Sequence, residues 1–323
     1  MPAPPSHISD YDPRFFRTCT FPLLRRLGYG TRVTINNGLP AGSPSATPLA
    51  ISLSAWDESG SYLGTTDQIA ELSPGEIVKL EAETLLDSLL PTEVEGDALA
   101  TFHLVPEGLR GSTSTEVATK DLMAHMSASD DFVEFHQKPK GVITGVAYQT
   151  GPLNDARFGS SRSTVVQAPK VIVSDTVDTL FCLMNLSTSF DYDNQVEMDF
   201  WILGPDGKRI TRGWVEVPPF TYRLVSMTET LERAGALDDF REAGGRGMFL
   251  GYSKNGTAVP LSLTRNRSSG AIACDHTLPP IFYLTSWGGE TRLKANARLE
   301  QEFFSAPREG DAVPTYTAIP ATA

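Results

Sequence analysis

The sequence predicts an all-β protein, mainly antiparallel, built from two tandem β-sandwich domains that arose by internal duplication, each with a short helix. Short stretches in which apolar and polar residues alternate recur along the chain, as in half-buried strands. Turns rich in Gly and Pro separate them, as in sandwiches. One pattern of strands, turns and helix occurs twice, with Pro74 and Pro219 marking a period of 219 − 74 = 145 residues. A period this long indicates duplicated domains rather than a solenoid.

Length and composition agree with this plan. The chain has 323 residues, 40% hydrophobic and 20% charged, which is a globular mixture, and single cores rarely grow beyond about 250–300 residues. We therefore predict domains at 13–158 and 165–305, a small polar linker at 159–164, and extended, flexible segments at 1–12 and 306–323. A single continuous barrel is the alternative, since the sheets of two such units could merge.

The repeat can be followed element by element. Each copy has a strand ending in Asn, a strand ending in Trp, a Gly turn, a Pro before another strand, Glu-Thr-Leu opening a short helix, and a further strand. In the first copy these are 32–37, 50–56, Gly60, Pro74, 83–85 and 98–103, and in the second 180–185, 196–201, Gly207, Pro219, 229–231 and 247–252. The match is one of pattern more than of identity.

Each step has a local cause. Ile51, Leu53 and Ala55 alternate with polar residues, which places them on one face of a strand. The Gly-Pro-Asp-Gly run that ends at Gly207 predicts a turn, because Pro presets φ and Gly accepts positive φ. Thr84, or Thr230 in the second copy, is the expected N-cap of the helix.

The copies differ in two places. The first has a long excursion at 107–135 where the second turns tightly, and loops of this length are often functional. The second adds 290–304, in which Leu293, Ala295, Ala297 and Leu299 alternate with polar residues. Alanine favours a helix, but the period of two favours a strand, and we predict a strand.

Charge and cysteine content bound the partners and the compartment. Lys and Arg total 27 against 39 Asp and Glu, a formal net charge of −12, which argues against nucleic acid and anionic membranes as partners. No apolar run approaches the roughly 20 residues of a membrane helix, and no secretory signal opens the chain. We therefore expect a soluble, acidic, cytoplasmic protein.

The three cysteines are too few for a disulfide scaffold. The order Cys182, Trp201, Cys274 is that of immunoglobulin domains, in which two cysteines pair across the sheets. Ile272 stands where such domains have Tyr, two residues before the second Cys. We expect buried thiols rather than a disulfide.

Histidines and carboxylates gather around the excursion. His103, His125 and His136 lie there with Asp130, Asp131 and Glu134, and such side chains could bind Zn²⁺ or another divalent cation. Glu134 and His136 share one face of a predicted strand. The candidate ligands are His103, Glu134, His136 and His125. No cofactor is otherwise predicted, and ordinary surface residues are the alternative.

A second cluster, Cys274-Asp275-His276, is the candidate catalytic set. Neighbours on a strand point to opposite faces, so Asp275 and His276 do not pair easily, whereas Cys274 and His276 share a face. The short basic run Arg265-Asn266-Arg267 suits a carboxylate or phosphate. We predict it as a binding element together with Asp130 and Asp131, and solvated surface charge is the alternative.

The chain has no Gly-x-Gly-x-x-Gly, P-loop, Gly-x-Ser-x-Gly or Cys-x-x-Cys motif. We therefore predict a non-enzymatic ligand- or protein-binding or assembly protein, recognising its partner through 107–135 and 266–276. A metal-assisted enzyme acting on a small organic substrate in an inter-domain cleft is one alternative. A structural subunit of a larger assembly is the other, and a homo-oligomer would fit it.

Overall fold

The computed structural model of the chain describes residues 17–38, 47–66, 68–89, 96–107, 131–137, 142–148, 164–187, 192–276 and 300–308. Contacts divide the chain into two compact units. The first unit is Met1–Leu153 with Ser187–Tyr192 and Ala318–Ala323, and the second unit is Asn154–Leu186 with Asp193–Thr317. All described strand pairs are antiparallel and the helices are few and short, which confirms the predicted all-β class.

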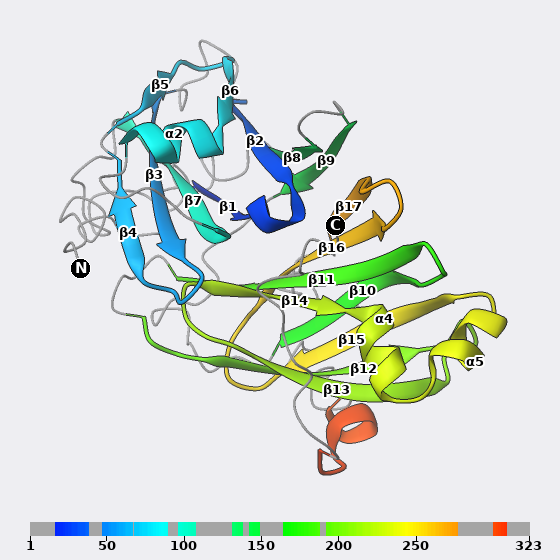
Figure 1. The fold of residues 1–323 in the computed structure, drawn as a ribbon. Coiled ribbons are helices and arrows are strands. Elements are labelled where there is room, and N and C mark those ends of the chain that lie inside the picture. Colours follow the sequence, from blue (N-terminus) through cyan, green and yellow to red (C-terminus); the bar gives the residue numbers. More distant parts are fainter. Residues whose placement is uncertain are drawn as a thin grey trace. The chain divides into compact units, whose positions relative to one another are not determined.

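The first unit contains two sheets (Figure 1). The first has the order β1 (Arg17–Leu23), β7 (Ala98–Pro106), β3 (Leu49–Asp57), β4 (Tyr62–Thr65), with β5 (Ala70–Leu72) also on β3; the second has the order β6 (Ile77–Glu81), β2 (Tyr29–Asn36), β8 (Asp131–Gln137), β9 (Val142–Tyr148). A 3₁₀ turn (Arg25–Leu27) and helix α2 (Ala82–Leu89) complete the described elements of this unit.

The second unit also contains two sheets. The first has the order β10 (Thr164–Ile172), β15 (Arg246–Ser253), β12 (Val196–Leu203), β13 (Arg209–Val217), and the second has the order β14 (Thr221–Ser226), β11 (Val177–Asn185), β16 (Val259–Asn266), β17 (Ile272–His276). Helices α4 (Met227–Arg233) and α5 (Leu237–Glu242) follow β14, and a π-helical turn, η5 (Glu300–Phe304), lies near the end of the described chain.

The two units share one strand order. In the first sheet of each unit, the order β1, β7, β3, β4 corresponds to β10, β15, β12, β13. In the second sheet, the order β6, β2, β8, β9 corresponds to β14, β11, β16, β17. The register agrees, since Leu49 pairs with Leu72 as Val196 pairs with Val217. In this register Trp56 corresponds to Leu203, so the strand-ending tryptophans of the sequence pattern are not equivalent.

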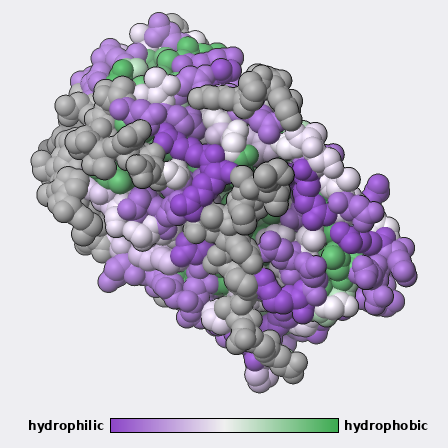
Figure 2. Space-filling model, viewed as in Figure 1, coloured by the Kyte–Doolittle hydropathy of each residue, from purple (hydrophilic) through white to green (hydrophobic). Residues whose placement is uncertain are grey.

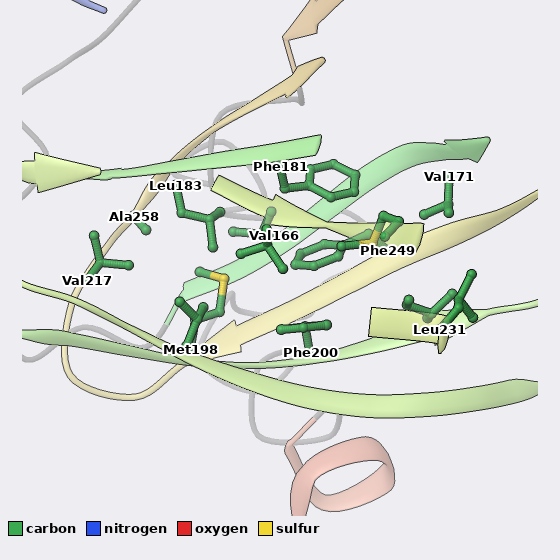
Figure 3. Packing of buried hydrophobic residues seen from close by; sticks show 14 of the residues in the cluster. Val166, Val171, Phe181, Leu183, Met198, Phe200, Val217, Leu231, Phe249 and Ala258 are labelled. Atoms are coloured by element: carbon green, nitrogen blue, oxygen red, sulfur yellow. The ribbon is translucent and has the colours of Figure 1, made fainter. Parts of the chain in front are cut away.

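The core of the second unit lies between its sheets. Alternate residues of β12, among them Met198, Phe200 and Ile202, are fully buried and pack against side chains from β11 and β15 (Figure 3). The ring of Phe249 stacks on Phe200 at 4.9 Å and on Phe181 at 4.4 Å between centroids. Each such buried side chain stabilises the fold by roughly 1.5–3 kcal/mol.

The first unit is likewise held by buried apolar side chains from both of its sheets. They include Phe21, Leu53 and Phe102 from the first sheet and Val33 and Phe135 from the second. No helix in the described part of either unit is long and apolar enough to cross a membrane.

The helix start differs from the prediction. Ser226, not Thr230, is the N-cap of α4, because its Oγ accepts a hydrogen bond from the Glu229 N–H at 3.1 Å. Ser226 and Glu229 form the Ser-x-x-Glu pattern of a capping box. Thr84 lies inside α2, which begins at Ala82.

The end of the chain differs too. The strand prediction for 290–304 is wrong over Glu300–Phe304, which form the π-helical turn, and 290–299 lie outside the described residues. Ala306 and Arg308, expected in a flexible tail, contact the second unit. The segment 1–12 and residues 159–163 of the expected linker lie outside the described ranges.

Candidate functional site

The outer face of the first sheet of the second unit carries an unusual set of side chains. Because β12 buries its even-numbered residues, Asp199 and Trp201 point to the other side of the sheet. The register places Asp199 between Tyr252 and Trp214. It places Trp201 between Leu250 and Arg212. We call Asp199, Trp201, Arg209, Arg212, Trp214 and Tyr252 the aromatic face.

The residues Glu300–Arg308, here called the C-terminal segment, cover the aromatic face (Figure 1, red ribbon for the helical turn). The Trp201 Nε1–H donates to the carbonyl oxygen of Phe303 at 2.7 Å. Phe304 is buried and its ring stacks on Tyr252 at 5.3 Å between centroids. Phe304 thereby joins Val165, Leu203, Leu250 and Tyr252 in an apolar cluster separate from the sandwich core.

Two arginines of β13 bind the main chain of this segment. Arg209 donates from Nη2 to the carbonyl oxygen of Glu302 at 2.6 Å, and its guanidinium lies 4.6 Å from the centre of the Phe303 ring. Arg212 donates from Nη1 to the carbonyl oxygen of Ala306 at 2.7 Å. Main-chain carbonyls and aromatic rings are therefore both recognised.

An ion pair between a buried carboxylate and a partly exposed arginine fixes the end of the segment. Asp199 is only 7% exposed and accepts from Arg308 through both oxygens, from Nε at 2.9 Å and from Nη2 at 3.0 Å. Arg308 also donates to Glu197 at 3.1 Å, and its guanidinium lies 4.7 Å from the Trp214 ring. Burial alone would lower the pKa of the Arg308 guanidinium, but the pairs with Asp199 and Glu197 outweigh burial and raise that pKa.

The start of the segment is held by a weaker, solvent-accessible pair. The Glu300 carboxylate accepts from the Lys254 ammonium at 2.6 Å and from the Tyr252 hydroxyl at 2.9 Å. Both hydrogen bonds favour the charged carboxylate and hold the pKa of Glu300 below its ordinary value. The aromatic face thus holds the C-terminal segment, a helical turn with the few residues that follow it, through its carbonyls, its rings and its arginine.

The equivalent face of the first unit is built quite differently. In the shared register, Ser54 occupies the position of Trp201, His103 that of Tyr252, and Thr65 that of Arg212. The Ser54 hydroxyl lies 2.9 Å from His103 Nε2 and 2.6 Å from the Thr65 hydroxyl. All of Ser54 and nearly all of His103 are buried.

Further hydroxyls extend this network. Thr20 and Thr101 hydrogen-bond each other across β1 and β7, and Tyr62 donates to the Thr65 hydroxyl at 2.6 Å. Burial raises the pKa of Tyr62 against the opposing effect of that hydrogen bond. The first unit therefore carries a partly buried hydroxyl network where the second carries a surface covered by the C-terminal segment.

The predicted zinc ligands come from different sheets. His103 lies on β7, whereas Glu134 and His136 lie on β8 in the other sheet, where His136 Nε2 is 3.7 Å from a Glu81 oxygen. Arg32 stands between Glu81 and Glu134, at 2.5 and 4.0 Å from their oxygens, so an arginine already neutralises these carboxylates. Over the described ranges, no group of three potential ligands gathers. His125 lies outside those ranges, and the zinc hypothesis stays a prediction.

The candidate catalytic residues lie on β17 at the edge of its sheet. Asp275 is exposed, Cys274 is half-buried, and the side chain of His276 is outside the description. Cys182 and Cys274 pair with residues of β16 from opposite sides, so they lie two strands apart in one sheet. That separation, about 9–10 Å, is too great for a disulfide. None of the three cysteines forms one, but Cys274 is only half-buried, against the expectation of buried thiols.

The predicted basic binding element holds its own turn together. The Asn266 carboxamide oxygen accepts from the N–H groups of Ser268 and Ser269. Arg267 donates to the carbonyl oxygens of Ser174 and Asp175 at 2.9 and 3.0 Å, joining the turn after β16 to the turn after β10. Arg265 is half-buried on β16, Asp131 is buried at the start of β8, and Asp130 lies outside the described residues.

Sequence reasoning missed the aromatic face and the C-terminal segment. A signal was present in β12, because Asp199 and Trp201 occupy outward positions next to a hairpin that also carries Trp214. Elsewhere the described surface is mainly hydrophilic in the view of Figure 2. Among the described residues, the large hydrophobic side chains that are exposed are Ile77, Phe132 and Met248.

No protein-family model and no curated protein matches the chain. Solved structures similar to it include a beta-glucuronidase from glycoside hydrolase family 2, with 10% identity over 83% of this chain and 24% of that one and a TM-score of 0.17. A glycosyl hydrolase family 2 member from Bacteroides cellulosilyticus has 9% identity over 81% and 28%, with a TM-score of 0.17. The Bacteroides uniformis beta-glucuronidase 2 calcium binding mutant has 10% identity over 80% and 26%, also with a TM-score of 0.17.

This chain thus spans only about a quarter of the length of the solved structures that it matches. At TM-scores this low, the likeness supports no argument about what this protein does.

Proposed function

We propose that the protein is a non-enzymatic, protein-binding assembly protein built from two duplicated β-sandwich domains, and that its aromatic face recognises a peptide segment that forms a helical turn. One observation carries this proposal. The aromatic face binds the C-terminal segment through carbonyl oxygens, a buried Phe304 ring and a bidentate Asp199–Arg308 pair. Buried aromatic anchors and desolvated arginines are the usual centres of protein interfaces.

The duplication is supported by the shared strand order and by the equal pairing registers of the two units. It explains how one unit can carry a hydroxyl network while the other carries a binding surface at the equivalent positions. The absence of disulfides among the three cysteines supports the cytoplasmic location that is part of this proposal.

The test uses a chain truncated before Glu300 and a fluorescent synthetic peptide of residues 300–308. The sandwich core contains no residue of the segment, so the truncated chain should keep its cooperative unfolding. Saturable binding, followed by fluorescence anisotropy, is the expected result. Asp199→Asn should weaken it about tenfold, because Arg308 then loses its bidentate partner and keeps only the more exposed Glu197 of its two carboxylates.

Ser52→Ala is the matched control, since Ser52 occupies the position of Asp199 in the first unit. This variant should bind the peptide as the truncated parent does. A folded truncated chain that binds neither the peptide nor a sequence-scrambled version of it would overturn the proposal.

A further inference from the structure

The C-terminal segment lies on the aromatic face of its own chain in the structure, and we infer that at high protein concentration it exchanges onto the aromatic face of a second copy, so that exchanged segments join chains into homo-oligomers. This inference rests on the proposed function, because it requires that the aromatic face recognise the segment. It goes further by naming the partner as the chain itself.

The fold does not depend on where the segment comes from. The sandwich core of the second unit and the apolar cluster around Phe304 are separate, and the core includes no residue of Glu300–Arg308. The segment can therefore leave its own face without opening the core, which is the condition for exchange at low cost.

The aromatic face requires an occupant. Without the segment, the Asp199 carboxylate would keep the Arg212 guanidinium at 3.3 Å but lose its bidentate partner Arg308. The ring of Tyr252 and the indole of Trp201 would lose the groups of the segment that cover them. A segment supplied by another copy makes the same contacts equally well.

The chain is long enough to reach a second copy. Between His276 at the end of β17 and Glu300 lie residues 277–299, which number 299 − 277 + 1 = 23. An extended chain of that length spans at most about 80 Å, whereas a domain of this size has a radius of gyration of only about 15 Å. The length thus permits both a closed copy and an exchanged pair.

Concentration decides between these two states. Binding partners joined in one chain generally have effective concentrations in the millimolar range or below, so dilute chains close on themselves. As the protein concentration approaches that value, exchange between copies competes with closure. Reciprocal exchange gives a closed dimer, and head-to-tail exchange gives a longer chain of copies.

The experiment uses the full chain and a zero-length cross-link. Lys254 Nζ lies 2.6 Å from a Glu300 oxygen, so a carbodiimide should join the two residues by an amide bond with loss of water. Natural and ¹⁵N-labelled chains are mixed in equal amounts, equilibrated over a range of concentrations, cross-linked and digested. Mass spectrometry then shows whether Lys254 and Glu300 came from one chain or from two.

We expect mixed-isotope Lys254–Glu300 links whose share rises with concentration towards about half of all links, the statistical limit of complete exchange. The Lys208–Asp206 pair, at 2.8 Å within one turn, is the internal control and must give single-isotope links only. Glu300→Gln should abolish the Lys254 link, which verifies its assignment.

A charge exchange between two full-length variants sharpens the test. In Asp199→Arg the face repels its own Arg308, and in Arg308→Asp the segment is repelled by its own Asp199. Mixing the two variants restores both pairs, but only between copies. We expect a complex in sedimentation velocity from the mixture, with every Lys254–Glu300 link of mixed isotope, and monomers from each variant alone.

The outcomes separate this inference from the proposed function. Links of single isotope at every concentration, together with a monomeric variant mixture, would overturn exchange while leaving peptide recognition by the aromatic face intact. If the natural chain forms no Lys254–Glu300 link and the truncated chain binds no peptide, both proposals are wrong.

Discussion

Asn37 and Asn185 make the same pair of hydrogen bonds in the two units. Each side chain is buried at the end of its strand, β2 or β11, and donates from Nδ2 to two main-chain carbonyl oxygens. The acceptors are Thr47 at 2.8 Å and Leu72 at 3.0 Å for Asn37, and Asn194 at 2.9 Å and Val217 at 2.8 Å for Asn185. Each carboxamide therefore ties the entry of one strand to the end of another at equivalent places.

Replacing either asparagine by Ala should lower the free energy of unfolding by about 2–4 kcal/mol, because two buried carbonyls lose their donor. The nearly isosteric Asp should be at least as damaging, since its oxygens cannot donate to carbonyls. Urea denaturation measures both. Asn36→Ala, at the half-buried neighbour of Asn37, is the control. Equal losses at 36 and 37 would contradict the role assigned to the buried pair.

Phe220 occupies the place in the second unit that Gly75 occupies in the first, in the turn after a proline. Gly75 has φ +84°, and Phe220 is the one non-glycine residue with positive φ, at +55°, in the described chain. Phe220→Gly should be more stable than Phe220→Ala by about 1 kcal/mol, because only Gly adopts this backbone without strain. Both variants lose the buried ring and should be less stable than the natural protein.

Tyr222, a buried β14 residue with ordinary φ, supplies the control. At position 222 the Ala variant should be more stable than the Gly variant, which is the usual order where φ is negative. The same ranking at positions 220 and 222 in chemical denaturation would refute the backbone explanation.

The charge on Glu229, in α4, should make the stability of the protein depend on pH. Burial, followed by repulsion from Asp178, raises the pKa of Glu229 in the folded protein. The folded state therefore binds this proton more tightly than the unfolded state, and the cost appears as pH rises through the raised pKa. Glu229→Gln should stabilise the protein by about 0.5 kcal/mol at neutral pH, since the group is partly solvated. The gain should vanish below the unfolded pKa.

Thermal unfolding of Glu229→Gln across acid to neutral pH checks this, with Glu242→Gln, at an exposed position on α5, as control. Parallel stability curves for the natural protein and Glu229→Gln would show that the carboxyl group does not titrate as described.

Local patterns predicted much of the fold. The alternation in β3 predicted that Ile51, Leu53 and Ala55 share one face, and the structure buries all three. The Ser-x-x-Glu signal at Ser226 was also present in the sequence, although the prediction placed the helix start at Thr230. Such features depend on neighbours within a few residues, which is why the sequence contains them.

Strand order could not be predicted from local patterns, because it depends on pairing between distant segments. The structure inserts β7 between β1 and β3 but pairs β8 with β2, and so separates His103 from His136. The aromatic face was harder still to predict from the sequence. Its ligand begins about a hundred residues after Trp201 and is recognised largely through main-chain carbonyls, which carry no sequence signal.

Glu300 makes the binding of the C-terminal segment sensitive to acid. Hydrogen bonds from Lys254 and Tyr252 lower its pKa in the bound segment below the ordinary value of 4.5. The bound state therefore releases this proton more readily. Its contribution is complete above the pKa of the free peptide and is lost as pH falls through the lowered pKa.

Because Glu300 is largely solvated, its contribution should be modest, about 0.2–1 kcal/mol, or up to about fivefold in affinity. The measurement compares the 300–308 peptide with its Glu300→Gln version on the truncated chain between pH 7 and pH 3. The natural peptide should bind more tightly at pH 7, and the two affinities should converge in acid. Tyr252→Phe should reduce the difference at neutral pH, because it removes one of the two donors. A Gln peptide that binds as tightly as the natural one at pH 7 would mean that Lys254 and Tyr252 do not hold the segment in solution.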